Sequence, residues 1–358
     1  MKNMLSWLGR IRACTLLAAK ERTGDPSLKV TIKDIARMAE VSISTVSRVV
    51  NGSKPVNEDV RRRVMDVMRQ MNYRPELTAR ADEAEGAPRI GLIMPQDDHT
   101  VLSEFSKGIQ RIAGLYGYDV LFGLTDGSIG NELHYLNLFQ TIRTQGLLFV
   151  GSSLGPMHLE LIGRSGLPCV LAGQESGDKR IPSVHVDNRT ASYEAVTYLL
   201  QQGRRDIAMI RAAGAGGVGE ERYKGYEGAL QDAGLPIRQE RIAASGFSVE
   251  DGMAAMRRIL EQGPPPDAVF CAADGMAIGA MNYLMDEGLR VPDDIAVFGF
   301  DNSSMATAVR PQLSSVEYSA TEIGMTAARK LVKLIRGESV SPMHTNVAHD
   351  LKIRGSTG

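Results

Sequence analysis

Residues 30–51, VTIKDIARMAEVSISTVSRVVN, carry a row of side chains suited to contacting DNA. Small hydroxylated residues and one arginine lie opposite the apolar positions Val46, Val49 and Val50 if this stretch is helical. Arg48 can donate two hydrogen bonds to a guanine, and Ile43 can touch a thymine methyl group. Serine and threonine hydroxyls can reach phosphates or base edges. The chemistry that this spacing allows is recognition of the major groove.

Three short helices are predicted to hold this row in place. Thr31 can cap the first helix, Ser42 the second, and Asn57 the third, where two acidic residues then suit the positive end of the helix dipole. Each helix has one apolar face, made by Ile32, Ile35, Ala36 and Ala39, then by Val46, Val49 and Val50, and then by Val60, Val64, Val67, Met68 and Met71. The arrangement favours a helix-turn-helix domain. The alternative is a plain three-helix bundle in which Arg61, Arg62 and Arg63 form a solvated face.

Charge is distributed unevenly along the 358 residues. Residues 1–81 hold 16 Lys and Arg against 8 Asp and Glu, whereas the remainder holds 25 against 34. The front of the chain therefore suits a polyanion and the rest does not. Three widely spaced cysteines without a CxxC pair indicate neither a disulfide framework nor a zinc site. No apolar run is long enough to span a membrane, so we expect a cytoplasmic, nucleoid-associated protein.

Beyond residue 89, strand-like runs alternate with amphipathic segments. The runs are RIGLIMP, DVLFG, GLLFVG, PCVLAG, DIAMI, AVFCA and IAVFGF. Such alternation predicts α/β architecture with parallel sheets covered on both faces, and the number of strands favours two lobes. A ligand cleft is then expected at the carboxyl ends of the strands.

Two short motifs leave an enzyme as the alternative class. Gly214, Gly216 and Gly219 satisfy GxGxxG after a predicted strand, as in dinucleotide sites. Gly151, Ser153 and Gly155 satisfy GxSxG, as in the nucleophile elbow of hydrolases. Gly155 and Pro156 imply more loop than an elbow allows, and the first motif lies in a glycine-rich loop. We therefore expect neither a catalytic residue nor a cofactor, and the scattered histidines predict no metal site.

Two stretches of the headpiece resemble a known family closely. TIKDIARMAEVSISTVSRVVNGS and VNEDVRRRVMDVMRQMNYRP are similar to the DNA-binding headpiece of the lactose/galactose repressor (LacI/GalR) family, and VDNRTASYEAV, ERYKGYEGAL, VPDDIAVFGFDN and PQLSSVEYSATEIGMTAARKLV to its core. The resemblance implies a two-lobed, periplasmic-binding-protein-like (type I) core behind the helix-turn-helix domain. It further implies a homodimer that binds a palindromic DNA operator, and a regulator, specifically a repressor, controlled by a small-molecule effector, most commonly a carbohydrate.

The same resemblance implies the domain limits. We expect a poorly ordered extension at residues 1–29, the DNA-binding domain at 30–74, a hinge at 75–88 and the effector-binding and dimerisation core at 89–358. Lobe 1 would comprise about 89–187 and 318–342, and lobe 2 about 188–317 and 343–358. The chain would thus cross between lobes near Asp187, Tyr318 and Met343.

Particular residues inherit DNA-binding roles from the family. Base readers would be Ile43, Ser44 and Arg48, and phosphate contacts would be Thr31, Ser42, Thr45, Ser47 and Asn51. In the hinge, Ala79 and Arg80 match a segment that enters the minor groove. Asp82 stands where the family has an intercalating leucine, and a carboxylate there opposes insertion between base pairs. We expect this protein to bend its operator less than its relatives do.

Three residues inherit effector roles, namely Arg222, Phe247 and Asp301. An arginine can donate to hydroxyls or anions, a phenylalanine can stack on a ring, and an aspartate can accept hydrogen bonds from a sugar or base. The alternative is that Arg222 and Asp301 form a structural ion pair. Val150, Gly173 and Ala273 replace polar residues of the family's sugar sites, and PQDDHTVLSEF lacks the usual Asn-Pro-Phe-Phe. The effector thus stays open, with a protein corepressor or no effector as alternatives.

Overall fold

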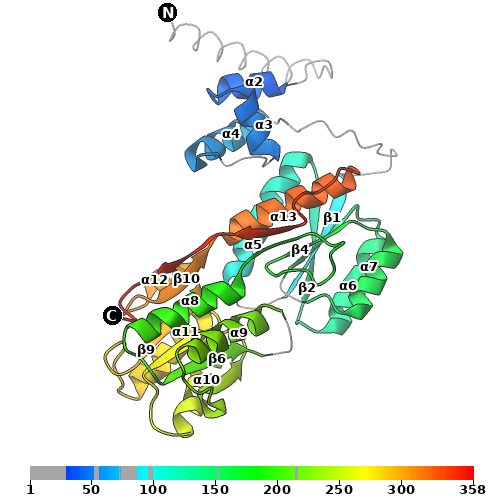
Figure 1. Cartoon of the computed structure of the whole chain (residues 1–358). Coiled ribbons are helices and arrows are strands. Elements are labelled where there is room, and N and C mark those ends of the chain that lie inside the picture. The colour runs from blue at the N-terminus through cyan, green and yellow to red at the C-terminus, as the bar shows by residue number, and fades with distance from the viewer. Residues whose placement is uncertain are drawn as a thin grey trace, which may run out of the picture. The chain divides into compact units, whose positions relative to one another are not determined.

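The computed structural model describes residues 30–51, 56–71, 73, 87–95, 100–150, 153–213 and 217–358 (Figure 1). Within these residues the chain forms a helical headpiece and a separate α/β core of two sheets. The extension at residues 1–29 and most of the hinge lie outside the described residues. The expected α/β class with parallel sheets and an N-terminal helical domain is confirmed.

The headpiece consists of α2 (Ile32–Met38), α3 (Ile43–Asn51) and α4 (Glu58–Gln70). All three predicted caps form: Thr31 donates from its backbone N–H and its hydroxyl to the Asp34 carboxylate, and the Ser42 and Asn57 side chains accept from backbone N–H groups of their helices. Glu40 adopts a positive φ of 55° in the tight turn between α2 and α3. Ten of the predicted core residues are buried, joined by Met65: Ile35, Ala36, Ala39, Val46, Val49, Val50, Val64, Val67, Met68 and Met71. Ile32 and Val60, which were also predicted, are only half-buried.

The first sheet of the core has the strand order β11-β5-β4-β3-β1-β2. Its strands are β1 (Arg89–Pro95), β2 (Asp119–Thr125), β3 (Leu147–Val150), β4 (Cys169–Ala172), β5 (Ser183–Val186) and β11 (His344–Val347). Its helices are α5 (Thr100–Tyr116), α6 (Ile129–Thr141), α7 (Pro156–Ser165) and α13 (Ala320–Ile335). Helices α6 and α7 cover one face and α13 covers the other (Figure 1).

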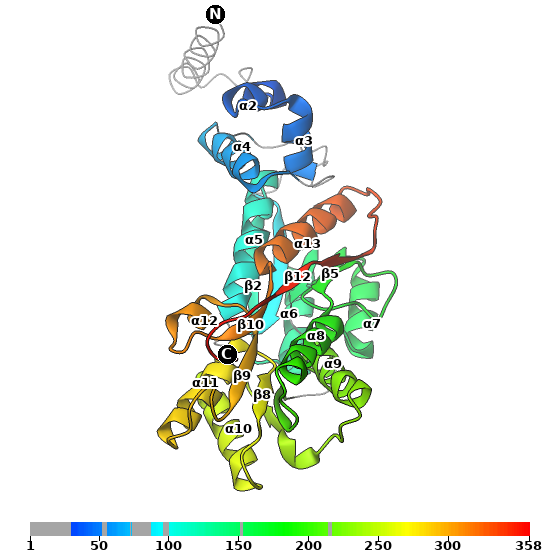
Figure 2. The same ribbon diagram turned by 60° about the vertical axis from the view of Figure 1, so that its left-hand side comes forward.

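The second sheet has the order β12-β10-β9-β8-β6-β7. Its strands are β6 (Ile207–Ala212), β7 (Ile242–Ser245), β8 (Ala268–Cys271), β9 (Ala296–Asp301), β10 (Ser314–Tyr318) and β12 (His349–Lys352), of which β12 alone is antiparallel to its neighbour. Its helices are α8 (Asn188–Gln201), α9 (Gly217–Asp232), α10 (Val249–Glu261), α11 (Asp274–Asp286) and α12 (Ser304–Ala308), with a 3-10 turn at Gln239–Arg241. Helices α8 and α9 lie on one face and α10 and α11 on the other (Figure 2).

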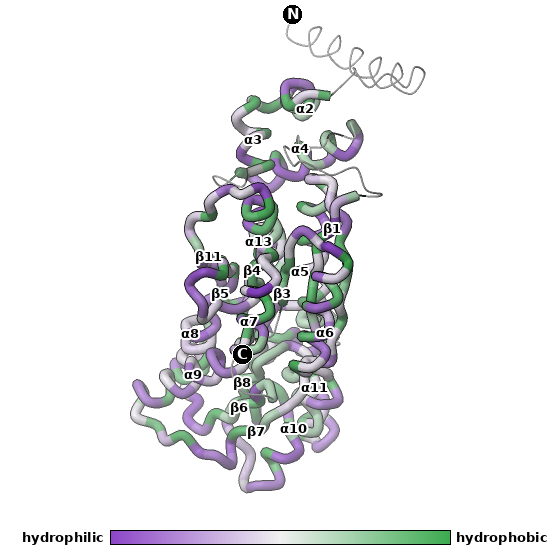
Figure 3. The backbone as a smooth tube through the Cα atoms, turned by 90° about the vertical axis from the view of Figure 1, so that its right-hand side faces the viewer, coloured by the Kyte–Doolittle hydropathy of each residue, from purple (hydrophilic) through white to green (hydrophobic). Residues whose placement is uncertain are grey.

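Hydrophobic residues follow the central strands of both sheets, and hydrophilic stretches follow the outer loops (Figure 3). Strands β3, β4, β8 and β9 are buried along their whole length. Parallel strands covered by helices on both faces read as continuous apolar runs, which is why these strands could be predicted from the sequence.

The chain passes between the sheets three times. It leaves β5 for α8 at Asp187 and leaves β10 for α13 at Ser319, close to the expected positions. The third passage is at Ala348, later than the expected Met343, because residues 344–347 pair with β5 as the edge strand β11 of the first sheet. These polar residues lack the apolar pattern that identified the seven predicted strands.

Reciprocal glycines allow two pairs of helices to pack with their backbones in close approach. A Cβ on Gly279 of α11 would lie 2.0 Å from the Val249 carbonyl oxygen of α10, and one on Gly252 would lie 2.3 Å from the Met276 carbonyl oxygen. Gly108 and Gly324 play the same reciprocal part between α5 and α13. Because a carbonyl of a packed helix cannot move aside easily, these positions require glycine.

Replacing Gly279 with alanine should therefore lower the free energy of unfolding by about 1 to 3 kcal/mol, despite the better helix propensity of alanine. Gly163 of α7 is the matched control, because no described atom lies within 4 Å of its ideal Cβ position. Gly163→Ala should raise stability by up to about 1 kcal/mol. Urea unfolding of both variants measures the difference, and an equal response of the two would contradict this account of the helix packing.

Candidate DNA-binding and effector sites

The outer face of α3 has the composition expected of a groove-reading helix. Ile43, Ser44 and Arg48 are exposed, with Ile43 at 46 %. The exposed Ser42 hydroxyl lies 2.7 Å from the Thr45 hydroxyl and 2.8 Å from that of Ser44. These three hydroxyls therefore form one cluster at the start of the helix, where phosphate oxygens are favoured.

The remaining predicted DNA contacts differ in accessibility. Thr31 is exposed at the start of α2, although its hydroxyl already donates to Asp34, and Ser47 is half-buried. Asn51 is the last residue of α3, and its side chain is outside the described part of the chain. The hinge residues Ala79, Arg80 and Asp82 also lie outside the described ranges. The structure thus gathers Ser42 to Arg48 on one helix and leaves the hinge roles as predictions.

A central pocket of about 80 Å³ lies between the two sheets and brings together all three predicted effector residues. It is lined by Pro95, Val101, Leu102, Phe105, Val150, Gly173, Ala212, Val218, Gly219, Arg222, Phe247, Ala272, Asp301 and Tyr318. Most of this lining is apolar. The pocket stands beyond the carboxyl ends of β1, β3, β6 and β9, where an α/β cleft is expected.

Arg222 is the only Lys or Arg side chain in this lining, and it is held on several sides. It comes from α9, is 4 % exposed, and its guanidinium carbon lies 3.5 Å from the centroid of the Phe300 ring. Its Nε donates to Asn188 Oδ1 at 2.9 Å and its Nη1 donates to the Ala272 carbonyl oxygen. Its Nη2 lies 3.4 Å from Asp301 Oδ1. A buried guanidinium needs such partners, because an isolated buried charge is very costly.

Asp301 ends β9 in an uncommon backbone conformation, with a φ of +104°. Its Oδ1 also accepts a hydrogen bond of 2.9 Å from the Tyr318 hydroxyl. Burial, and next the nearby Asp301 carboxylate, hold the pKa of Tyr318 well above its usual value, so Tyr318 acts as a donor. Backbone strain of this kind persists where the surroundings fix it and is common at ligand sites.

Phe247 follows β7 and packs against the apolar core of the second sheet while lining the central pocket. Val150 and Gly173, two of the positions that depart from polar sugar sites, line the same pocket. The third such position, Ala273, is the N-cap of α11, and its neighbour Ala272 lines the pocket. The apolar character inferred from the sequence is therefore present in the pocket itself.

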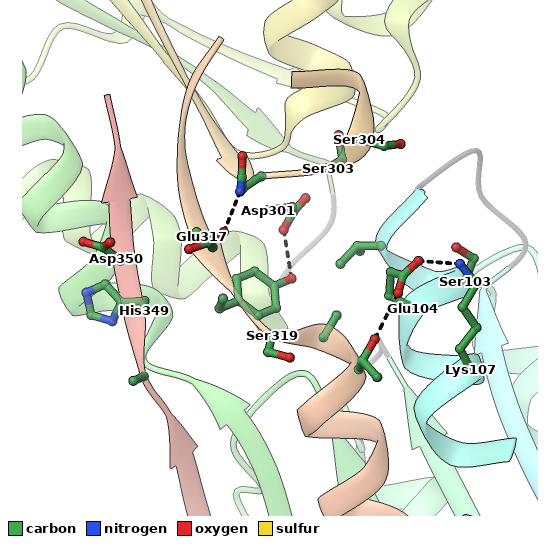
Figure 4. A pocket seen from close by; sticks show the side chains of 16 residues that line it. Ser103, Glu104, Lys107, Asp301, Ser303, Ser304, Glu317, Ser319, His349 and Asp350 are labelled. Atoms are coloured by element: carbon green, nitrogen blue, oxygen red, sulfur yellow. Dashed lines mark hydrogen bonds and ion pairs between the residues drawn. The ribbon is translucent and has the colours of Figure 1, made fainter. Parts of the chain in front are cut away.

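Two wider polar cavities adjoin the central pocket. The hinge pocket, of about 930 Å³, is lined by Val101, Ser103, Glu104 and Lys107 and by residues 301–304, 317–321 and 348–350. Figure 4 shows Glu104 and Lys107 of α5 on one side of it, with His349 and Asp350 of β12 on the other. The outer pocket, of about 440 Å³, is lined by Ser153, Gly217, Val218, Glu220, Glu221, Lys224 and Asn346 and by residues 174–177 and 185–189.

Three functional candidates were missed from the sequence. Tyr318 and Asn188 were seen only as parts of family motifs, and their bonds to Asp301 and Arg222 depend on strands distant in sequence. Asp274, fully buried at the start of α11, accepts hydrogen bonds of 2.6 Å from the Ser315 hydroxyl and from the Ser303 backbone N–H. It thereby fixes the loop that follows Asp301. The one signal in the sequence that could have identified Asp274 is its charge, because it stands between the two apolar runs that form β8 and β9.

Described residues of the GxSxG and GxGxxG motifs make structural contacts. Ser153 Oγ donates to Gln174 Oε1 at 3.3 Å, whereas His158 accepts from the Gly155 N–H at 3.1 Å and bonds Glu132 at 3.0 Å, so the serine and histidine are engaged separately. Gly219 lets α9 approach β6, since its Cβ would lie 2.9 Å from that of Ala212. Gly151, Gly214 and Gly216 are outside the described ranges.

No group of three or more His, Cys, Asp or Glu side chains suited to a metal ion occurs among the described residues. Within the same residues, no helix is both long and apolar enough to cross a membrane.

The pKa of Asp274 should make the stability of the fold depend on pH. Burial, and next the charge of Asp301, raise its pKa to about 7, above the ordinary 3.8. The folded protein thus binds this proton more tightly than the unfolded chain, so stability is full below about pH 4 and falls as the pH rises to about 7. The expected loss is roughly 4 kcal/mol. Asp274→Asn cannot ionise and should lack this loss. Urea unfolding between pH 4 and 8 measures it, and parallel curves for the two proteins would refute the assignment.

Comparison with known proteins identifies the family of both parts of the chain. Residues 31–76 match the model of bacterial regulatory proteins of the lacI family, and residues 196–357 match a periplasmic binding protein-like domain. Catabolite control protein A of Priestia megaterium is 34 % identical over 331 residues, and the transcriptional regulator RegA of Clostridium saccharobutylicum 33 % over 334, each match covering 92 % of this chain and 100 % of the relative.

Solved structures of regulators are similar over most of the chain. The transcriptional regulator CelR in complex with cellobiose has a TM-score of 0.70 at 26 % identity, covering 92 % of this chain and 100 % of that one. CcpA of Lactococcus lactis has a TM-score of 0.71 at 29 % identity, covering 76 % and 100 %. These relatives are transcriptional regulators, and nothing in them supports the enzyme alternative. The chain belongs to the LacI family of DNA-binding transcriptional regulators.

Proposed function

We propose that this regulator is a homodimeric repressor that binds a palindromic operator, and that a carbohydrate or related small molecule held between the lobes controls its operator affinity. It would act in the cytoplasm, on the DNA of the nucleoid. The observation that carries the proposal is the pairing of an exposed α3 face rich in hydroxyls and Arg48 with an interlobe pocket containing Arg222 and Asp301. The cellobiose bound by the neighbouring regulator CelR supports a carbohydrate ligand.

Ile43, Ser44 and Arg48 are proposed to contact bases, with Thr31, Ser42, Thr45, Ser47 and Asn51 on phosphates. This division follows from side-chain chemistry: the guanidinium and the apolar group carry base information, whereas hydroxyls at a helix start suit phosphates. One such headpiece covers too little DNA for high specificity, so two headpieces on a two-fold symmetric site are needed.

The edge of the first sheet supports a dimer. Strand β2 ends the strand order, and its Phe122 and Leu124 are 39 % and 43 % exposed. Gly123 between them is buried against Tyr135 of α6, so the two apolar side chains lie on the strand face opposite that helix. An exposed apolar edge strand invites association. A second copy of the chain, related by a two-fold axis, would cover it with the same residues.

The lobes link the two sites. Tyr318 and Asp301 belong to the second sheet, whereas Val101, Phe105 and Val150 of the same pocket belong to elements of the first. A ligand that contacts both sets of residues stabilises one lobe geometry over another. The difference between its binding free energies for the two geometries is the coupling free energy available to change DNA binding.

Arg48→Ala should lose roughly 1 to 3 kcal/mol of operator affinity and relax specificity at one base pair of each half-site. Arg69→Ala on the exposed side of α4 removes the same charge outside the proposed reading face and is the control. Competition binding with single-base operator variants distinguishes them. Equal losses on operator and random DNA would show that Arg48 contacts phosphate instead.

Asp301→Asn should abolish the response of operator binding to ligand while leaving ligand-free operator affinity within about threefold of wild type. The asparagine keeps an acceptor for Tyr318 but loses the charge that pairs with Arg222. Asp293→Asn, at an exposed ion pair, is the control. Fluorescence anisotropy of labelled operator with cellobiose and a panel of monosaccharides measures both quantities. Loss of folding or dimerisation in Asp301→Asn and Arg222→Lys together would favour the purely structural ion pair.

Phe122→Glu should convert the dimer into monomers, because it places two like charges across the two-fold axis in an apolar contact. Operator affinity should fall by at least about tenfold, since one headpiece then binds alone. Met157→Glu, at a 60 % exposed side chain of α7, should leave both unchanged. Sedimentation equilibrium decides the matter, and a dimeric Phe122→Glu protein would remove β2 from the interface.

A further inference from the structure

A further cavity, of about 180 Å³, lies at the amino-terminal ends of β6, β7 and β8 in the second sheet. This basal pocket is lined by residues 205–207, 226, 230, 235, 236, 238, 241 and 267. Ile207 begins β6 there, whereas Ala212 ends the same strand in the lining of the central pocket. Among the described residues, none lines both the basal pocket and the central, hinge or outer pocket. The basal pocket is therefore a separate place in the fold.

The charged side chains of its lining are three arginines and two aspartates. Arg241 donates from Nε to Asp206 Oδ1 at 2.9 Å and from Nη2 to Asp206 Oδ2. Arg238 lies 3.7 Å from the same Oδ1, so one carboxylate serves two guanidinium groups. Asp267 Oδ2 accepts instead from the backbone N–H groups of Arg205 and Asp206, at 2.8 and 2.9 Å.

The remaining guanidinium groups at this end of the sheet bond to uncharged acceptors. Arg205 Nη1 donates to the Leu200 and Arg204 carbonyl oxygens, at 2.8 and 3.2 Å. The two side-chain bonds of Arg204 also go to carbonyl oxygens, one of them that of Asp267. Four guanidinium groups thus stand against two carboxylates. Glu240, the next carboxylate along the chain, is exposed and lies outside the lining. The excess of positive charge favours an anion.

Arg241 also has a donor to spare. Its side chain is only 5 % exposed, and its Nη1 is buried without a hydrogen-bond acceptor among the described residues. A buried donor left unsatisfied costs free energy, the more so on a charged group. Arg205 and Arg238 line the same cavity from exposed positions. Guanidinium groups match the planar geometry of a carboxylate, which accepts two parallel hydrogen bonds from such a fork.

Apolar side chains form the other half of the lining, namely those of Ile207, Tyr226, Leu230, Leu235 and Pro236. The Tyr226 hydroxyl donates to the Ile207 carbonyl oxygen at 2.8 Å, so the tyrosine is already satisfied. A bare inorganic anion would leave these surfaces against water, whereas an apolar body would cover them. An apolar cavity of about 150 Å³ admits benzene. The basal pocket therefore has room for one small ring or a short chain.

We propose that the basal pocket is a second small-molecule site, which binds a monocarboxylate with a small apolar body. The carboxylate accepts hydrogen bonds from Arg205, Arg238 and Arg241, and the apolar body lies on Leu230 and Leu235. The inference does not depend on the proposed carbohydrate control, because the two ligands occupy opposite ends of the strands of the second sheet.

Calorimetric titration of the full-length protein at constant ionic strength tests this with four probes. Benzoate has both features, benzamide has the ring without the charge, and acetate and inorganic phosphate have the charge without the ring. Benzoate should bind with a Kd of about 1 mM or lower. Benzamide should bind at least about tenfold more weakly, since it loses the charge-assisted bonds. Acetate and phosphate should bind at least about tenfold more weakly, since they bury little apolar surface.

Two variants with matched controls locate the binding. Arg205→Gln should raise the benzoate Kd at least about fivefold. Arg258→Gln should leave it within about twofold, because Arg258 is likewise exposed and bonded to a carbonyl oxygen but lies outside the basal pocket.

Leu235→Ala should raise the benzoate Kd at least about fivefold and leave that of acetate within about twofold. Leu289→Ala should change neither. Leu289 is the closest match, because both leucines are half-buried, follow a glycine of positive φ at the end of a helix, and donate from the backbone N–H to the helix at 2.9 Å. Urea unfolding confirms that all four variants are folded.

Several results would overturn the inference. Absence of benzoate binding at a concentration of about 20 mM would remove the site altogether. Benzamide binding as tightly as benzoate would exclude recognition of the charge, and acetate or phosphate binding as tightly would reduce the pocket to an adventitious anion site. A benzoate Kd unchanged in both Arg205→Gln and Leu235→Ala would place the ligand elsewhere, for instance beside Arg222.

Discussion

The buried guanidinium of Arg222 is the constraint on which the core depends. It connects Asn188 at the first passage between the sheets, the carbonyl oxygen of Ala272 after β8, and Asp301 at the end of β9, and it lies on the ring of Phe300. No one of these contacts compensates the desolvation of a charge, but together they do. The ends of the strands are thus fixed around one cation, which lies in the wall of the central pocket.

This arrangement makes the pocket sensitive to how the lobes are placed. Tyr318, which donates to Asp301, is the last residue of β10 and immediately precedes the second passage between the sheets. The third passage, at Ala348, lines the same hinge pocket. A change in the angle between the lobes must alter the backbone at these passages, because few other residues connect the sheets. The hydrogen bond from Tyr318 to Asp301 and the passages between the lobes are therefore mechanically coupled.

Sequence patterns predicted much of this, and the limits have physical causes. The headpiece helices, their caps and seven core strands follow from local signals: periodicity, N-cap residues and apolar runs. Strands β5, β7, β10, β11 and β12 did not, because they are short and contain polar residues. Strands β11 and β12 are moreover defined by pairing with partners far away in the sequence. Arg222, Phe247 and Asp301 were identified through family motifs and do share a pocket. Tyr318, Asn188 and Asp274 were missed because their roles arise from contacts between distant strands.

The two proposed sites differ in how their polar groups are occupied before any partner binds. On α3 the exposed Arg48 and Ser44 side chains have few structural duties, so DNA can engage them with little rearrangement of the headpiece. In the central pocket, by contrast, Arg222, Asp301 and Tyr318 are bonded to one another and to the strands. A ligand can bond them only by replacing or sharing these internal bonds. Its binding free energy then depends on the arrangement of the strands and passages, and such dependence is what converts occupancy of a pocket into a change of conformation.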